Sequence, residues 1–341
     1  MTHVRFNQIL KDYLEINNIS QKEFALRIGI SQKHLIDILS GNKDLTLSLI
    51  EAISIVTGIS KDYIIEIEFN SKMDQEINNY LKKNNITISN FVNKFNYKEL
   101  KDKGWLNFTH IDDKISVLLD ILKYLRVSSI ENLYNLDCDI LYKSKNDKPE
   151  LLILWLERCY KLSLEQSVNK YDSKNVQVLV NYIRENATNN VFDENELIKV
   201  FNNNGVKLVI EDDLSTSKIR GAFKVNRNTP SIYLTRKHHR IADIYFALLH
   251  ELSHCKTDYN KAKGTNMITH CDEEVIDSQA LNWMVDNDYY NEVVLRNDYD
   301  IEKENKYPRC FIVYRLALDN KIKYSNEIYQ KYNILLGSSK Q

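Results

Sequence analysis

The segment His-Glu-Leu-Ser-His at residues 250–254 constrains this chain more than any other feature. The run before it, IADIYFALL, has the apolar spacing of a buried helix. On such a helix His250 and His254 lie one turn apart on the same face, where both imidazoles can bind one zinc ion. Glu251 then lies beside the metal and can take a proton from bound water as the catalytic base. The alternative is a buried helix with two incidental histidines.

A catalytic zinc also needs a third protein ligand and an open position for water. A second helix, expected over residues 271–285, offers Glu273 as that ligand, nineteen residues after His254. Asp277 lies one turn further on the same face, where it can orient a histidine. Glu274 is the alternative ligand, because helical periodicity alone does not decide which of these two neighbouring residues faces the histidines. Two imidazoles and one carboxylate suit Zn²⁺ best. The alternative is a helix with a solvated acidic face.

These residues resemble the ImmA/IrrE family of zinc metallopeptidases, in which HELGH is followed by a helix of the form E-x-x-A-(N/D)-x-F-A. The similarity extends upstream to RGAFKVNRNTPSIYLT and downstream to FIVYRLALDNKI. Three positions depart from the family pattern: Ser253 replaces a glycine, Ile276 an alanine and Gln279 an aromatic residue. The resemblance implies a zinc-dependent peptidase.

The amino terminus carries an independent signal. Residues 6–65 form five short amphipathic segments separated by turn residues. Ser20 begins a capping box, Gly29 ends that helix, and Ser31 starts the next one, SQKHLIDILSG. Two helices joined by a short glycine-containing turn predict a helix-turn-helix whose second helix enters the DNA major groove. The segment resembles the Xre-type helix-turn-helix domain, and its tail, GNKDLTLSLIEAISIVTGISKDYI, is similar to HigA-like antitoxins.

Carried over from that resemblance, the DNA-contacting residues fall into two groups. The expected base-reading residues, at the exposed start of the second helix, are Gln32, Lys33 and His34. The expected phosphate-backbone contacts are Gln21, Ser31, Asn42 and Lys43. The first 66 residues hold seven Lys/Arg against eight Asp/Glu, so this domain should bind DNA weakly unless it dimerises or is locally polarised. The alternative is a helical domain used for protein contacts.

The expected fold is mainly α, in three parts. Residues 1–66 form the all-α helix-turn-helix domain, 67–185 a helical middle region with a connector at 143–150, and 186–341 an α+β zincin-like peptidase. A small antiparallel sheet is expected around residues 206–211, 220–226 and 231–235. The last of these segments is a candidate edge strand that could hold an extended peptide, although it could equally be a core strand.

Composition limits the setting of the protein. The net charge of −1 gives no general attraction to polyanions or membranes, and no apolar run is long enough to cross a bilayer. Five cysteines without a CxxC pair suit free thiols in a reducing compartment, so we expect a cytoplasmic protein. Cys255 and Cys271 flank the proposed ligands, which raises a redox switch as the alternative to buried, inert thiols.

Three functions remain open. The chain could be a DNA-binding regulator whose zinc peptidase cleaves a specific protein, such as a repressor or antitoxin. It could instead be a HigA-like repressor or antitoxin with little protease activity, or an interaction protein that neutralises a toxin. Each predicts double-stranded operator DNA or a protein partner, and a homodimer is conceivable. Candidates for stabilising the reaction's oxyanion are Tyr245, His270, Tyr314 and Arg315.

Overall fold

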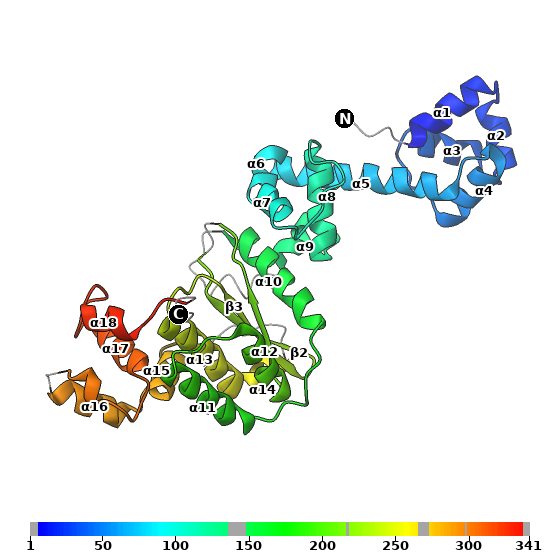
Figure 1. Cartoon of the computed structure of the whole chain (residues 1–341). Coiled ribbons are helices and arrows are strands. Elements are labelled where there is room, and N and C mark those ends of the chain that lie inside the picture. The colour runs from blue at the N-terminus through cyan, green and yellow to red at the C-terminus, as the bar shows by residue number, and fades with distance from the viewer. Residues whose placement is uncertain (1–5, 136–147, 216–217, 265–272, 297–298, 337–341) are drawn as a thin grey trace. The chain divides into compact units, whose positions relative to one another are not determined.

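The computed structural model describes residues 6–135, 148–215, 218–264, 273–296 and 299–336. The described chain is mainly helical with one small three-stranded sheet in the C-terminal half, which confirms the expected fold class (Figure 1). It divides into two compact units, residues 1–93 with 106–133 and residues 94–105 with 134–341. No helix in the described ranges combines the length and apolar character needed to cross a membrane.

The first unit contains a helical head and a helical extension. Its elements are α1 (Phe6–Ile16), α2 (Gln21–Arg27), α3 (Gln32–Leu39), α4 (Leu47–Thr57), α5 (Lys61–Lys83), α6 (Ile88–Asn93), α8 (Lys114–Leu125) and α9 (Ile130–Asn135). The head closes around fully buried side chains from α1 to α5, including Phe6, Phe24, Leu35, Ile53 and Ile64. Within a helix such buried residues recur at helical spacing, as Phe6, Leu10 and Leu14 do in α1, so hydrophobic burial holds the short helices together.

Local capping fixes where the head helices begin. The Ser20 hydroxyl accepts a hydrogen bond from the backbone N–H of Glu23 at 3.2 Å, and the Ser31 hydroxyl accepts one from His34 at the same distance. Gly29, with φ of +77°, supplies the left-handed turn between α2 and α3 that a β-carbon would strain. The helix-turn-helix geometry therefore follows from residues that the sequence makes visible.

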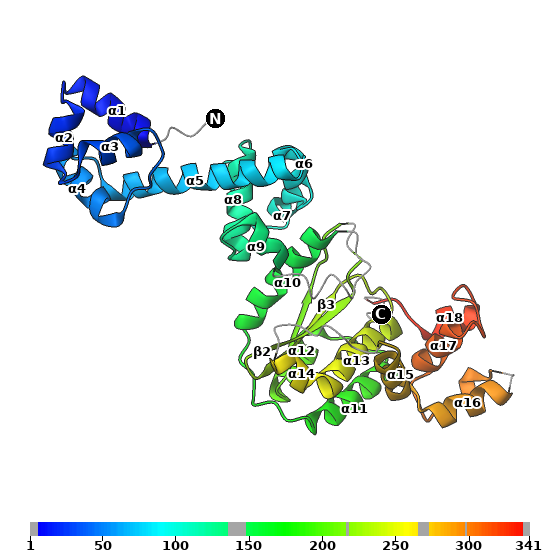
Figure 2. The ribbon, with the colours of Figure 1, turned by 180° about the vertical axis from the view of Figure 1, so that it is seen from behind.

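The second unit surrounds the sheet with helices. Before and within the sheet region lie α7 (Tyr97–Asp102), α10 (Pro149–Leu164), α11 (Asn175–Thr188), α12 (Glu194–Asn203), β1 (Lys207–Glu211), β2 (Gly221–Asn226) and β3 (Thr229–Thr235). After the sheet lie α13 (Ile241–Thr257), α14 (Tyr259–Gly264), α15 (Glu273–Met284), α16 (Asn287–Arg296), a 3₁₀ turn (Ile301–Lys303), α17 (Arg309–Leu318) and α18 (Glu327–Tyr332). Helix α13 lies next to strands β2 and β3, and α15 lies next to α13 (Figure 2).

The strand order β1-β3-β2 corrects one sequence expectation and decides one open alternative. The sheet is mixed and not antiparallel, because β1 pairs with β3 in parallel while β2 and β3 form an antiparallel hairpin. Of the two alternatives for Ser231–Thr235, edge strand or core strand, the structure shows the core strand, with neighbours on both sides. Its burial on both faces explains this position, since a strand covered on both faces suits the middle of a sheet. The described edge strand beside the α13 helix is β2.

Different helices pack against the two faces of β3. Ile232 and Leu234 belong to the main core with the apolar side of α13 and α11, while Tyr233, one residue out of phase, meets Trp155 of α10 at 6.4 Å between ring centroids. This alternation is the two-residue period of a strand. Helix α13 is consequently held against the sheet on a fixed face.

The C-terminal segment holds the start of α13. Arg240, the N-cap residue, makes no side-chain cap, and the fully buried Asn333 instead accepts a hydrogen bond from the Ala242 N–H at 2.9 Å through its Oδ1. The Ile241 N–H also bonds the Ile334 carbonyl at 3.1 Å. The buried amides at this helix start, which have no partner inside the helix, are thus satisfied by a segment some ninety residues away in the chain.

We expect Asn333→Ala to lower the free energy of unfolding by about 1–3 kcal/mol, the usual cost of losing a helix cap and leaving a buried amide unsatisfied. Denaturant unfolding followed by far-ultraviolet circular dichroism measures this. The control is Asn291→Ala, which removes an exposed asparagine of α16. Equal stability of the two variants would show that the C-terminal segment does not anchor α13.

Candidate metal centre and helix-turn-helix surface

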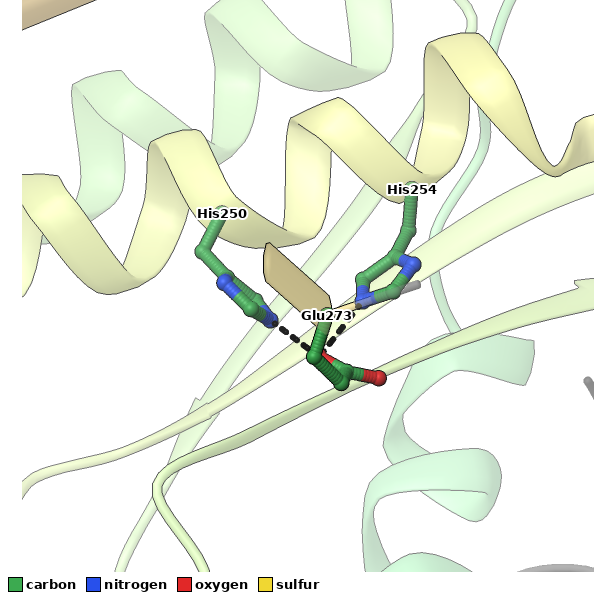
Figure 3. A group of neighbouring side chains, drawn as sticks. All are labelled: His250, His254 and Glu273. Atoms are coloured by element: carbon green, nitrogen blue, oxygen red, sulfur yellow. Dashed lines mark ion pairs between the residues drawn. The ribbon is translucent and has the colours of Figure 1, made fainter. Parts of the chain in front are cut away.

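Three side chains from two helices converge at the middle of α13. His250 and His254 lie one turn apart on α13, and Glu273 reaches them from the first residue of α15 (Figure 3). The Glu273 Oε2 atom lies 3.4 Å from His250 Nε2 and 3.6 Å from His254 Nε2. One ligand atom from each residue lies within 4.8 Å of the others. A tetrahedral zinc with bonds of about 2 Å separates its ligand atoms by roughly 3.3 Å, so the donor set fits such an ion.

The outer nitrogen of each imidazole is held by a carboxylate. His250 Nδ1 lies 2.8 Å from Asp277 Oδ1, and His254 Nδ1 lies 2.9 Å from Asp258 Oδ2. A proton on each Nδ1 leaves the Nε2 lone pair directed toward the shared point, as in metal-binding histidines. The sequence singled out Asp277 for this role but missed Asp258, which lies four residues after His254 and is almost fully buried. That spacing on one helix face was the available signal.

The electrostatics of the cluster favour a cation. Burial alone would lower the pKa of His250, but hydrogen bonds to Asp277 and Glu273 and the charge of Glu251 raise it to about 10. Burial likewise opposes protonation of His254, whose pKa is nevertheless raised by Glu273, Glu251 and Asp258. Hydrogen bonds from the two histidines hold the pKa of Glu273 far below its usual range. Four carboxylates thus surround two imidazoles, and positive charge at their centre is stabilised.

The two candidate carboxylates at the start of α15 occupy different environments. Both residues are exposed, but Glu273 contacts both histidines while Glu274 lies outside the group of converging donors. Glu251, between the histidines, is buried with 7% of its surface exposed, on the side of α13 that packs against β2. The geometry therefore places Glu273 with the imidazoles and puts a buried carboxylate next to them.

Two departures from the metallopeptidase pattern lie against each other. The Ser253 hydroxyl of α13 donates to Gln279 Oε1 of α15 at 2.5 Å, and the Thr257 hydroxyl reaches the same oxygen at 3.2 Å. A glycine at 253 could not form this bond, and an aromatic residue at 279 could not accept it. The pair therefore joins α13 and α15 by a polar contact.

Three of the four residues considered for oxyanion stabilisation are described, and each has other contacts. The Tyr245 hydroxyl donates to the Val191 carbonyl at 2.6 Å. Arg315 is buried, donates to the carbonyls of Leu281 and Val285, and stacks over a tyrosine ring 3.9 Å away. Both interactions secure the packing of helices. Tyr314 is buried against Phe246 with 5.4 Å between ring centroids, and His270 lies outside the described residues.

Cys255 is fully buried on α13, and burial raises the pKa of its thiol to about 12. Such a thiol is protonated and inaccessible, so it lacks the reactivity of a redox sensor. Cys271, the other cysteine beside the ligands, lies outside the described residues.

The helix-turn-helix surface presents its expected DNA-contacting residues in three places. Gln32 and Lys33 are exposed in the first turn of α3, and His34 is half-buried beside them. Gln21 is exposed at the first position of α2, while the Ser31 hydroxyl is engaged in capping α3. The remaining two, Asn42 and Lys43, are exposed between α3 and α4. Six of these seven residues are exposed, and the seventh, His34, is half-buried.

Comparison with known families supports the amino-terminal assignment. A helix-turn-helix family model matches residues 10–64, from within α1 into α5. No curated protein and no solved structure matches the chain. The protein thus carries a helix-turn-helix domain of the DNA-binding kind and belongs, at that level, among the transcription regulators.

Proposed function

We propose that this DNA-binding regulator also carries a zinc-dependent peptidase. The observation that carries the proposal is the convergence of His250, His254 and Glu273 on one point, with each histidine oriented by its own aspartate. The resemblance of residues 220–322 to ImmA/IrrE metallopeptidases supports the same assignment. The alternative, in which α15 only presents a solvated acidic face, does not explain why its first carboxylate meets two imidazoles that are each held by an aspartate.

Each residue of the centre has a role in hydrolysis. His250, His254 and Glu273 would hold the ion, which when bound supplies a Lewis acid that polarises a peptide carbonyl and acidifies water. Glu251 takes a proton from the attacking water and passes it to the leaving nitrogen as the peptide bond breaks. Asp258 and Asp277 keep the imidazoles in the tautomer that presents Nε2.

The substrate would lie along β2. This strand is the edge of the described sheet on the side of α13, so an extended peptide could pair with its outer backbone groups. Phe223 of β2 stacks over His254 with 6.3 Å between ring centroids and 11° between ring planes, which brings the strand alongside the ligands. The proposed peptide-binding strand is therefore β2 and not the segment 231–235, which lies in the centre of the sheet.

Zinc titration tests the proposal. Metal-free protein should take up one equivalent of Zn²⁺ per chain, because one set of three donors is assembled among the described residues. Isothermal calorimetry and metal analysis after gel filtration measure the stoichiometry. His254→Ala should take up none, whereas His34→Ala, which replaces a histidine of α3, should bind as the wild type does. A wild-type protein that holds no stoichiometric metal would exclude the peptidase.

The two activities together suggest a regulator that holds an operator and is switched by cleavage of a specific protein, of the repressor or antitoxin type. The alternative is a repressor or antitoxin whose metal site cleaves little. The buried Glu251 favours cleavage, because a purely structural metal site has no use for an acid between its two ligands.

For the DNA-binding surface, replacing Gln32 and Lys33 together with alanine should weaken operator binding by at least roughly thirtyfold, or about 2 kcal/mol, because paired base contacts are lost. Fluorescence anisotropy with the promoter of the protein's own gene measures this. Lys61→Ala, which removes an exposed charge at the start of α5, is the control. Unchanged affinity of the double variant would exclude α3 as the reading helix.

A further inference from the structure

We propose that Gly221, the first residue of β2, is a positioning residue for the general base: it leaves the space in which the Glu251 carboxylate lies. The inference rests on the proposed peptidase function and adds a residue to its site. The side of Gly221 where a β-carbon would stand faces the candidate metal centre, because the Glu251 carboxylate lies against it.

The approach of the strand to the carboxylate is very close. A β-carbon built on Gly221 would lie 2.6 Å from Glu251 Oε1 and 3.2 Å from its carboxyl carbon, well inside van der Waals contact. The Cδ2 atom of Leu234, which is paired with Gly221 across the hairpin, would lie 3.1 Å from this β-carbon. The carboxylate is thus enclosed by the strand backbone on one side and by its own helix on the other.

Backbone conformation does not require glycine here. Gly221 is absent from the residues with positive φ, unlike Gly29, Gly58 or Gly205, so alanine could adopt its backbone angles. A strand also accepts alanine at least as well as glycine. What remains to explain the glycine is the space that the carboxylate fills.

The neighbouring position on the same strand face supports this reading. Residues 221 and 223 share one face because a strand alternates every second residue. On this face Phe223 packs against the His254 ring, and the absence of a side chain at Gly221 leaves space for the Glu251 carboxylate. The strand therefore limits where these two α13 side chains can lie.

An alanine at 221 should separate folding from site geometry. The clash falls on the end of a flexible side chain, so the Glu251 carboxylate can swing away without moving backbone. The zinc ligands lie on other side chains and keep their positions. We therefore expect Gly221→Ala to fold and bind metal normally but to hold its general base in the wrong place.

Acetohydroxamate binding to the cobalt-substituted protein tests this without a substrate. The probe chelates the metal through its two oxygens and shares its proton with a carboxylate beside the metal, and the visible spectrum of Co²⁺ reports its dissociation constant. We expect Gly221→Ala and Glu251→Gln each to raise that constant about tenfold, the loss of one charge-assisted hydrogen bond. The double variant should show no further loss, because both changes remove the same contact. Ala222→Gly, on the opposite strand face, should bind as the wild type does.

The outcomes separate the inference from the function on which it rests. Wild-type binding by Gly221→Ala, with weakened binding by Glu251→Gln, would overturn the role of Gly221 and leave the peptidase standing. Unweakened binding by Glu251→Gln would remove both the assigned base and the inference. Failure of the wild type to bind Co²⁺ would remove the proposed function itself.

A second variant covers a failure to fold. If Gly221→Ala is insoluble or unfolded, Gly221→Ala combined with Glu251→Ala should restore the folded, metal-binding protein, because the shortened side chain vacates the space. Without such rescue the conflict lies elsewhere, and the proposed role of Gly221 is wrong.

Discussion

Glu251→Gln should reduce peptide-bond cleavage by roughly a hundredfold to ten-thousandfold, the usual contribution of a general base. The amide has nearly the same shape as the carboxylate but cannot accept the proton of the attacking water. The variant should still bind one zinc ion, because the donor group consists of His250, His254 and Glu273. The measurement is cleavage, followed by mass spectrometry, of proteins encoded beside this chain, with zinc stoichiometry determined in parallel.

The control for this variant is Glu292→Gln, which makes the same chemical change at an exposed position of α16. It should cleave at the wild-type rate. Equal cleavage by Glu251→Gln and the wild type would eliminate Glu251 as the base. If neither protein cleaves while both bind zinc, the metal site belongs to a repressor or antitoxin without protease activity.

Glu273→Ala should lose zinc affinity by more than a hundredfold, because it removes the only carboxylate in the donor group. The loss should exceed that of Asp258→Asn, which leaves all three donors in place but releases the ring of His254. Changes of such supporting residues typically cost about 10- to 100-fold in metal affinity. Competition with a chromogenic zinc chelator measures the affinities of both variants.

Glu274→Ala is the matched control, since it removes the same side chain one residue further along α15. Its carboxylate is exposed and outside the donor group, so zinc affinity should stay at the wild-type value. A large loss in Glu274→Ala with none in Glu273→Ala would reverse the assignment of the third ligand. Loss in both would mean that the two acids share the ion.

The sequence could predict those parts of the centre that are set by spacing along a helix. His250, Glu251 and His254 share one stretch of α13, and Asp277 follows Glu273 by one turn of α15. Helical periodicity fixes which side chains share a face, so both groups could be expected before any coordinates. The choice between Glu273 and Glu274 was open, because one residue turns a helix by about 100° and the start of α15 decides the face.

The sheet was harder to predict, since strands pair across long separations. Each strand was located within a few residues, but the parallel pairing of β1 with β3 depends on a crossover that leaves no local pattern. The sequence therefore could not decide whether residues 231–235 form an edge strand or a core strand, and the edge strand beside α13 is β2. The contact between Ser253 and Gln279 could not be predicted either, because it joins residues that are far apart in the chain.

The sequence by itself determined the helix-turn-helix head and the face of α13 that carries two histidines and an acid. Both depend on interactions within a few residues: caps, a left-handed glycine and the 3.6-residue period of a helix. Only the tertiary structure decided that Glu273 and not Glu274 meets those histidines, that Asn333 bonds the start of the helix bearing them, and that Gly221 lies against Glu251. These are contacts between segments distant in the chain, and they exist only once burial of the common core has packed those segments together.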